Sequence, residues 1–355
     1  MAEYKIGILN GDDIGLEIVP VAVEVLKTAV KRYPEIQIEW VPLPIGYPSF
    51  LEHGTTLLPE VRERLYTLDG WILGPIGHMA YPKDQPNCFN PHPILRREYD
   101  LVSNIRPAKS YAEIPCINPN VDLVIIRENN EGFQPDRNMF RGTSDCMPTP
   151  DMALSLRVIT RRNSTLVARE GFELARRRGG RKKVTAVHKN TVFKLGCGLF
   201  IEACRDVAKE YPDIEFETVV VDTFAMKMLM RPQDYDVVIT TNMFGDILSD
   251  EASMVTGSIG MLASASMNET KFGLYEPSGG SAPDIAGMNK ANPIATILSA
   301  AMMLRYSFDM TEEADAVENA VNRVLDDGIR TGDIMSDGMT LVSCSGMGDA
   351  VCERI

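Results

Sequence analysis

The stretch N-M-F-G-D-I-L-S-D at residues 242–250 decides the fold, because it joins two kinds of sequence pattern. Directly before it, the D-V-V-I run at residues 236–239 predicts a buried parallel strand. The stretch itself predicts a helix on which Asp246 and Asp250 share one face, about 5–6 Å apart. A strand that leads into such a helix indicates an α/β protein with a mainly parallel sheet.

The two aspartates have two interpretations. Carboxylates this close repel each other unless a cation lies between them, and a hard divalent cation suits oxygen ligands. The alternative is a solvated acidic helix face. The apolar neighbours Phe244, Ile247 and Leu248 count against a fully solvated face. From these residues alone both interpretations stay open.

The bulk composition limits the class of protein and its partners. A chain of 355 residues with 45% hydrophobic residues can bury a large core and predicts two domains. No apolar run is long enough for a membrane span. The formal charge of −13 argues against nucleic acid and anionic membranes as partners. Seven scattered cysteines and an N-terminus without a signal pattern predict a cytoplasmic protein.

The order of patterns along the chain predicts alternating strands and helices. A long segment at residues 129–150, rich in proline and polar residues, interrupts this rhythm and predicts a lid or an arm exchanged between subunits. We expect strands at 4–9, 70–73, 123–126, 183–187 and 237–240, and helices at 15–32, 199–210 and 311–327.

Three arginines are candidates for holding carboxylates. Arg106 follows the strand-like residues 102–105, and Arg127 closes the apolar run 123–126. Side chains at strand ends face the crevice where α/β folds bind ligands, and a guanidinium matches a carboxylate bidentately. Arg96 is the third candidate. Surface ion pairs are the alternative explanation for each of them.

Lys189 follows the predicted strand at 183–187. Beside a metal and arginines such a lysine acts as a base, whereas elsewhere it is a solvated cation. The four histidines lack the spacing of a metal motif, so zinc is not expected.

The run E-P-S-G-G-S-A-P-D at residues 276–284 predicts either a nucleotide-binding loop or a plain surface turn. Backbone N–H groups at Gly279 and Gly280 suit phosphates, and Asp284 suits a ribose hydroxyl but repels a 2′-phosphate. The sequence has no G-x-G-x-x-G after its first strand and no P-loop motif. The usual Rossmann and P-loop folds are therefore disfavoured.

Taken together, these motifs resemble the β-decarboxylating dehydrogenases, which act on isopropylmalate, isocitrate, homoisocitrate, tartrate or D-malate. The resemblance extends from Gly11 to about Asp349. Its most specific parts are the N-x-F-G-D-I-L-S-D run, G-S-A-P-D-I-A-G-x-x-x-A-N-P at 280–293, R-E-x-x-E-G at 127–132, and Arg106-Pro107.

The resemblance implies an isopropylmalate dehydrogenase-like two-domain α/β fold with a mixed, mainly parallel sheet, not the Rossmann fold. Residues 1–102 and 257–355 then form a discontinuous nucleotide-binding domain. Residues 103–256 form the domain for substrate, metal and dimerisation, with an arm at about 130–160. The active protein is implied to be a homodimer with shared active sites.

The resemblance also implies the roles of individual residues. The expected reaction is the NAD-dependent oxidation of a malate-like 2-hydroxy acid, with decarboxylation. Mg²⁺ or Mn²⁺ is bound by Asp246 and Asp250 together with Asp222 of the partner subunit. Lys189, also supplied by the partner subunit, is the catalytic base, and Asp222 is a second catalytic residue. Substrate carboxylates are held by Arg96, Arg106 and Arg127, and NAD by Gly280, Ser281, Ala282, Asp284 and Asn292.

Several positions depart from the family pattern. The tyrosine expected seven residues after Arg127 is Gln134, so the proton donor for the enolate is missing and decarboxylation is expected to be impaired. Water or Tyr81 are candidate replacements. Thr191 replaces an asparagine. The pattern G-D-G-I-G-P-E reads G-D-D-I-G-L-E, and we assign the replaced glycine to Asp12, where a positive φ is tolerable for aspartate.

The residues before Arg96 indicate the kind of substrate. Residues 90–93 read N-P-H-P instead of the paired leucines that suit an isopropyl group. His92 predicts a polar or anionic substituent, or a small substrate such as D-malate or tartrate. Two other functions stay open, a non-catalytic regulatory subunit of a related hetero-oligomer and a metal-dependent hydrolase.

Overall fold

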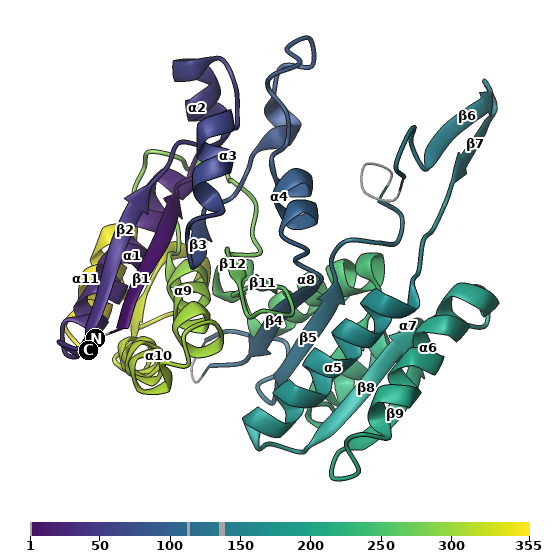
Figure 1. Ribbon diagram of the computed structural model, residues 1–355. Coiled ribbons are helices and arrows are strands. Elements are labelled where there is room, and N and C mark those ends of the chain that lie inside the picture. Colours follow the sequence, from purple (N-terminus) through teal and green to yellow (C-terminus); the bar gives the residue numbers. More distant parts are fainter. Residues whose placement is uncertain (1, 112–113, 135–138) are drawn as a thin grey trace.

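The computed structural model describes residues 2–111, 114–134 and 139–355, and its centre is a ten-stranded sheet (Figure 1). Six neighbouring strand pairs are parallel and three are antiparallel, which confirms the predicted mixed, mainly parallel sheet. In order across the sheet, the strands are β2 (Ile36–Pro42), β1 (Ala2–Leu9), β3 (Gly70–Leu73), β12 (Gly273–Tyr275), β11 (Ala265–Met267), β4 (Ser103–Lys109), β5 (Asp122–Glu128), β10 (Val237–Thr240), β8 (Lys183–His188) and β9 (Glu215–Val220).

The antiparallel pairs lie in the middle of the sheet and join two parallel halves. β11 runs antiparallel to both of its neighbours, and β4 runs antiparallel to β5. The strand direction therefore changes at the centre of the sheet.

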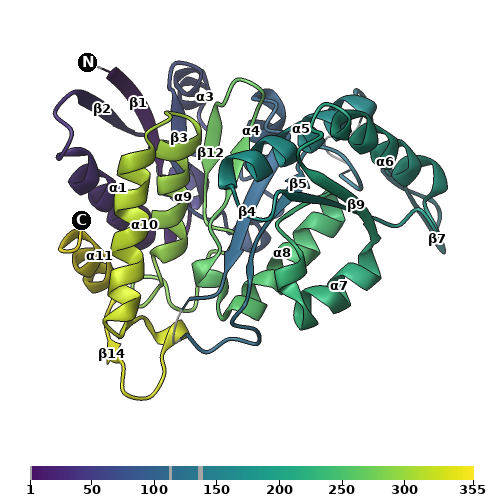
Figure 2. The ribbon, with the colours of Figure 1, turned by 90° about the horizontal axis from the view of Figure 1, so that it is seen from below.

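Helices cover both halves of the sheet (Figure 2). On the half that contains both chain ends, α1 packs against α9 and α11, and α9 packs against α10. On the other half, α5 packs against α6, while α8 packs against β4 and β5. The helices are α1 (Gly15–Val30), α2 (Gly46–His53), α3 (Pro59–Leu65), α4 (His92–Glu98), α5 (Arg161–Arg178), α6 (Lys194–Ala208), α7 (Val221–Met230), α8 (Asn242–Thr256), α9 (Ile294–Tyr306), α10 (Thr311–Asp326) and α11 (Cys344–Cys352), with short 3₁₀ turns at His78–Ala80, Pro232–Asp234, Ile259–Met261 and Gly332–Ile334.

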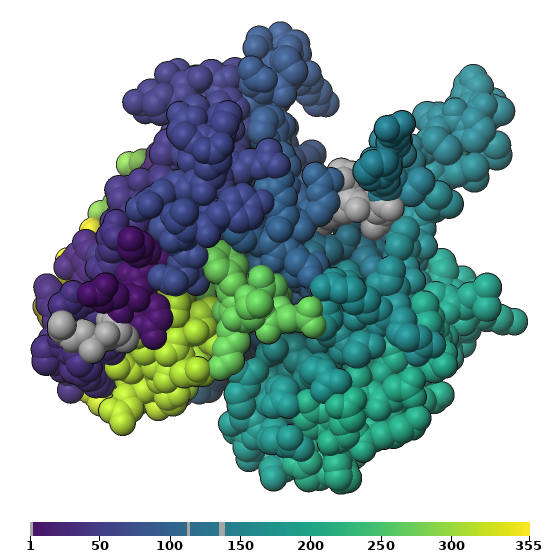
Figure 3. Space-filling model, in the orientation of Figure 1, coloured from purple at the N-terminus to yellow at the C-terminus, as the bar shows by residue number. Residues whose placement is uncertain are grey.

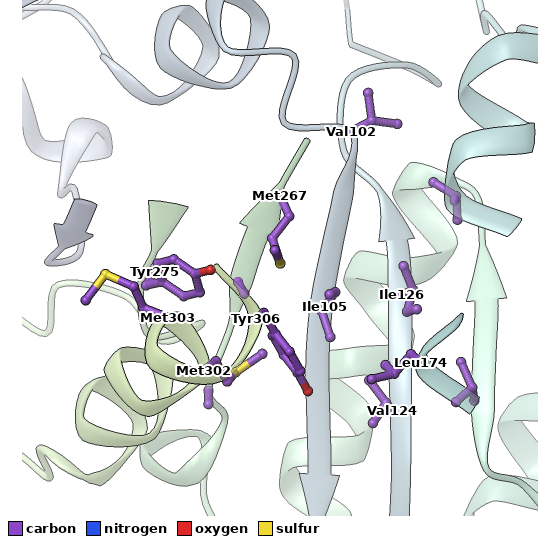
Figure 4. Packing of buried hydrophobic residues seen from close by; sticks show 14 of the residues in the cluster. Val102, Ile105, Val124, Ile126, Leu174, Met267, Tyr275, Met302, Met303 and Tyr306 are labelled. Carbon is purple, nitrogen blue, oxygen red and sulfur yellow. The ribbon is translucent and has the colours of Figure 1, made fainter. Parts of the chain in front are cut away.

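One core joins the two halves, because apolar side chains of central strands and flanking helices interlock (Figure 4). Ile105 on β4 and Ile126 on β5 are fully buried, and Met302 and Tyr306 on α9 belong to the same cluster. Among the described residues, no helix is both long and apolar enough to span a bilayer.

The segment predicted as a lid or arm contains a hairpin of β6 (Asp145–Thr149) and β7 (Met152–Ser155). The hairpin projects from the body, and all of its residues are exposed (Figures 1 and 3). Pro135, part of the same prediction, lies outside the described residues. A second small sheet pairs β13 (Ile329–Arg330) with β14 (Thr340–Leu341).

The turn between β1 and α1 corrects one expectation. The run G-D-D-I-G-L-E occupies residues 11–17, so the glycine of the family pattern is replaced at Asp13, and the assignment to Asp12 was wrong. Asp13 has a positive φ of 48°. Asp12 is buried instead, and its carboxylate accepts hydrogen bonds from the Gly77 backbone N–H and the Tyr81 hydroxyl, both at 2.6 Å. Asp12 thus ties this turn to the loop after β3.

Candidate functional site

The carboxylate pair lies on the second and third turns of α8, the helix that follows β10. Asp246 and Asp250 keep 49% and 58% of their side-chain surface exposed. Nη1 of Arg106 lies 3.3 Å from Asp246 and 3.7 Å from Asp250, and Arg127 also pairs with Asp246. Burial raises the pKa of Asp250, and Arg106 opposes this shift. The α8 helix thus presents both carboxylates next to two cations.

The arginines on β4 and β5 are buried and held from several sides. Nε of Arg106 donates to Asn104 at 2.6 Å, and its Nη1 donates to Ser249 at 2.7 Å. Arg127 donates from Nε and Nη2 to the side-chain oxygen of Asn242, at 3.1 and 2.6 Å. Burial lowers the pKa of Arg106, and the charge of Asp246 opposes this. The two guanidinium groups are therefore fixed in place before any ligand arrives.

Glu276 is a site residue that the sequence did not single out. It follows β12, is buried, and accepts hydrogen bonds from His92 Nε2 and Arg96 Nη2, both at 2.7 Å. Burial would raise the pKa of this carboxyl, but the positive charge of Arg96 and the hydrogen bonds from His92 and Arg96 hold it well below its usual range. Its position at the start of the glycine-rich run, directly after a strand, was the available signal.

A single cavity connects the arginines with the glycine-rich loop. It has a volume of about 110 Å³ and is lined by His92, Arg96, Arg106 and Glu276. Residues 277–280 of the loop also line it. The structure therefore brings predicted substrate-binding and cofactor-binding positions into one cavity.

Buried polar atoms without a partner are found on two residues that line this cavity and on Asn242, which contacts Arg127. Among the described residues, Arg96 Nε, Ser278 Oγ and Asn242 Nδ2 make no hydrogen bond. Because an unpaired buried donor is unfavourable, such atoms mark places where a polar ligand would bind.

The glycine-rich loop leaves room for a nucleotide. A side chain at Gly280 would meet no atom within 4 Å, and Ala282 has a φ of 43°. The Ser281 carbonyl accepts from the Ile14 N–H at 3.2 Å, which anchors the loop to the β1–α1 turn. Asp284 is exposed farther along this loop. These features fit a dinucleotide that has its phosphates near the loop backbone.

Asn292, the last predicted cofactor residue, lies at the start of α9. Its Nδ2 donates to Asp333 Oδ2 at 3.0 Å, and its Oδ1 accepts from the Ile294 N–H at 3.0 Å. The side chain is only half-buried. It therefore remains partly accessible from solvent.

Lys189 and Asp222 form a separate pair. Lys189 follows β8, Asp222 lies in the first turn of α7, and Lys189 Nζ is 2.9 Å from Asp222 Oδ1. The hydrogen bond from Lys189 lowers the pKa of Asp222. In the described part of the chain, no three or more His, Cys, Asp or Glu side chains are grouped to hold a metal. One chain thus does not unite Asp222 with Asp246 and Asp250.

The donor chemistry of the α8 pair still fits Mg²⁺ or Mn²⁺. Both ions prefer carboxylate oxygens and complete their shell with water or substrate oxygens. Two half-exposed carboxylates one helical turn apart supply part of such a shell and leave room for ligands from elsewhere.

Gln134 lies beside the arginines. Its Nε2 is 3.4 Å from the side-chain oxygen of Asn242, which also accepts from Arg127. Tyr81, a candidate replacement for the missing acid, does not line the cavity. Burial and its hydrogen bond to Asp12 raise the pKa of Tyr81 far above its usual range. The structure therefore gives no support to Tyr81 as the proton donor.

The two glutamates of the R-E-x-x-E-G run hold the backbone of their own loop. Glu128 is buried and accepts from the N–H groups of Asn130 and Glu131 at 2.7 and 2.8 Å. Glu131 accepts from the N–H of Thr160, the residue that caps α5. Only the arginine of this run reaches the carboxylate pair, so the motif combines one ligand-facing residue with structural support.

Arg157 contacts residues from several parts of the site. Its guanidinium lies over the rings of Phe133, Phe193 and Phe244, at 6.0, 4.8 and 5.6 Å from their centroids. Its Nη2 donates to Thr241 at 3.0 Å, just before α8. Arg157 thereby packs the Gln134 loop and the Lys189 loop against the start of α8.

The chain is similar to known proteins over almost its whole length. Residues 5–351 match the family model described as isocitrate/isopropylmalate dehydrogenase. The chain is 43% identical to a 3-isopropylmalate dehydrogenase of Pseudomonas fluorescens, covering 98% of this chain and 97% of the relative. It is 42% identical to the 3-isopropylmalate dehydrogenase of Carboxydothermus hydrogenoformans, covering 99% and 95%. The crystal structure of isocitrate dehydrogenase from Methylococcus capsulatus superimposes with a TM-score of 0.87 at 35% identity, covering 99% of both chains.

Proposed function

Because the chain belongs to the isocitrate/isopropylmalate dehydrogenase family, we propose that it oxidises a malate-like 2-hydroxy acid with NAD and a divalent metal, Mg²⁺ or Mn²⁺, and then decarboxylates it. The observation that carries this proposal is the shared cavity, which is lined both by Arg96 and Arg106 and by the glycine-rich loop. Arg106 also contacts both carboxylates of the predicted metal pair.

The arginines would hold the acid. A malate-like substrate carries two carboxylates, and Arg96, Arg106 and Arg127 offer the forked donors that bind such groups. The unpaired Nε of Arg96 is one donor available to it. Fixing both ends of the substrate orients its C2 hydrogen toward the loop side of the cavity, where the nicotinamide would lie.

Lys189 would take the proton of the C2 hydroxyl. An ammonium that is held by a carboxylate, as Lys189 is by Asp222, must release a proton before it can act as a base. When bound, the metal polarises the C2 oxygen and NAD accepts the hydride. Gln134 lacks an acidic proton, so protonation of the decarboxylated product would depend on water.

We propose that the active form is a homodimer in which Lys189 and Asp222 serve the site of the other subunit. Support comes from α7 and α8, which carry large apolar side chains on the surface of the single chain. These side chains are Met226, Leu229, Met230, Met243, Ile247 and Met254. The exposed β6–β7 hairpin, with Met147, Met152 and Leu154, would pair with a second copy in the same way.

The two proposed domains have different roles. We propose that residues 1–102 and 257–355 bind the nucleotide, and that residues 103–256 carry the substrate, metal and dimer surfaces. β4 begins at Ser103 and α8 ends at Thr256, so both borders coincide with the ends of elements. The exposed carboxylate of Asp284 supports NAD over NADP. Seven free cysteines are consistent with action in the cytoplasm.

The direct test is a substrate screen of the purified protein with NAD and Mn²⁺. D-malate, tartrate isomers, isocitrate and 3-isopropylmalate would be compared by NADH absorbance, with the Asp246→Asn variant as the inactive control. NADH formation that needs both Mn²⁺ and Asp246 supports the proposal. Binding of these acids without any NADH formation would instead indicate a regulatory subunit.

A further inference from the structure

The pair of His92 and Glu276 determines which hydrogen-bonding group the cavity offers to a substrate. His92 is the first residue of α4, and its backbone N–H donates to Asn90 Oδ1 at 3.0 Å. Its side chain keeps 15% of its surface exposed, and that of Glu276 keeps 7%. The backbone of His92 is therefore held by Asn90, and its imidazole is held at the cavity wall by Glu276.

Glu276 also fixes the proton of the imidazole. Its Oε1 accepts from Arg96 and its Oε2 is the atom next to His92 Nε2. A carboxylate held ionised between two such groups can only accept hydrogen bonds, so Nε2 must carry a proton. In the neutral ring the lone pair then lies on Nδ1.

Nδ1 has no hydrogen-bond partner in the described part of the chain, while the ring lines the cavity beside Arg96 and Arg106. An isopropyl group against this nitrogen would remove it from water without a partner, which is unfavourable. A third carboxylate would also be poorly placed, because Glu276 already neutralises part of the local positive charge. A hydroxyl both fits the small cavity and donates to Nδ1.

We propose that His92, positioned by Glu276, accepts a hydrogen bond from a hydroxyl on C3 of the substrate, so that the preferred substrate is a 2,3-dihydroxy diacid. This inference rests on the proposed dehydrogenase function and makes its substrate class specific. His92 is the specificity residue, and Glu276 is a positioning residue that acts through it.

The test compares tartrate isomers with D-malate, which lacks the C3 hydroxyl, in steady-state assays with NAD and Mn²⁺. The His92→Leu variant should raise KM for the preferred tartrate isomer about tenfold more than KM for D-malate, because one hydrogen bond is lost. The His92→Gln variant should keep most of the preference, because its amide oxygen can accept. His53→Leu, an α2 surface change, is the matched control.

Glu276→Gln tests the positioning role. Glutamine can donate as well as accept, so it no longer forces the proton onto Nε2. We expect the ratio of tartrate to D-malate kcat/KM to fall about tenfold, with the thermal unfolding midpoint recorded to confirm a folded protein.

The outcomes separate this inference from the proposed function. If the wild type oxidises D-malate and His92→Leu leaves the tartrate to D-malate ratio unchanged, the inference is wrong and the dehydrogenase function stands. A wild type that prefers 3-isopropylmalate has the same meaning. If no malate derivative reduces NAD in the presence of Mn²⁺, both the inference and the proposed function are overturned.

Discussion

Lys189 and Asp222 lie 2.9 Å apart in one chain, at a place separate from the Asp246 and Asp250 pair on α8. Asp246 pairs with Arg106 and Arg127 instead. Each half of this arrangement carries part of the proposed chemistry, and neither is complete alone. In the proposed homodimer, a second copy of the chain supplies the missing half of each site.

The Asp250→Asn variant should lose metal binding. Removing one carboxylate leaves Asp246 as the only α8 ligand, and divalent cations bind weakly to single carboxylates. At a Mn²⁺ concentration about 100-fold above its Kd, the wild type should gain about 2.7 kcal/mol of stability. Thermal unfolding with and without Mn²⁺ measures this. The exposed helix-end variant Asp326→Asn should behave like the wild type, and an equal Mn²⁺ response in Asp250→Asn would contradict the assignment.

Gln134→Tyr should improve decarboxylation. The side chain at this position lies beside Asn242 and Arg127, and tyrosine supplies the proton donor that glutamine lacks. The ratio of CO₂ released to NADH formed should be below one in the wild type and rise toward one in the variant. Equal and fast formation of both products by the wild type would show that Gln134 does not limit the reaction.

Asp284→Ala should relax the choice of nucleotide. Its exposed carboxylate is placed to repel a 2′-phosphate and to accept from a ribose hydroxyl. The ratio of kcat/KM with NAD to that with NADP should fall about tenfold or more. Asp337→Ala, another exposed acid, is the control. An unchanged ratio would place the ribose elsewhere.

Glu128→Gln should reduce the pH dependence of stability. Burial raises the pKa of Glu128 to about 7, against 4.5 for the ordinary group. The folded state therefore binds more protons than the unfolded state between these values, and stability falls as the pH rises through this window. The effect is at most about 3 kcal/mol.

Urea unfolding at pH 5 and pH 8 measures this effect. The free energy of unfolding of the wild type, relative to that of Glu128→Gln, should fall from pH 5 to pH 8. Relative to Glu312→Gln, an exposed change on α10, it should show no such trend. Parallel pH profiles for the wild type and Glu128→Gln would exclude a titrating Glu128.

The regular elements could be predicted because their signals are local. The apolar runs that became β3, β5, β8 and β10 are fully or almost fully buried, and burial on both faces of a sheet leaves an uninterrupted apolar pattern. The helix that carries Asp246 and Asp250 also follows from its own residues. The local sequence pattern was enough to predict these elements.

The partners of site residues could not be predicted, because they come from distant parts of the chain. Glu276 lies 184 residues from His92, and nothing near either residue reveals their contact. Tertiary packing, not local pattern, sets these features.

Complementation between two inactive variants tests the shared active site most directly. Lys189→Ala and Asp246→Asn homodimers should each be inactive, because each lacks one half of every site. After the two are mixed, unfolded and refolded together, heterodimers contain one intact site, so about a quarter of wild-type activity should return by random pairing. Recovery of that activity is the predicted result. No recovery, with heterodimers shown to have formed, would contradict the sharing of Lys189 and Asp222 between subunits.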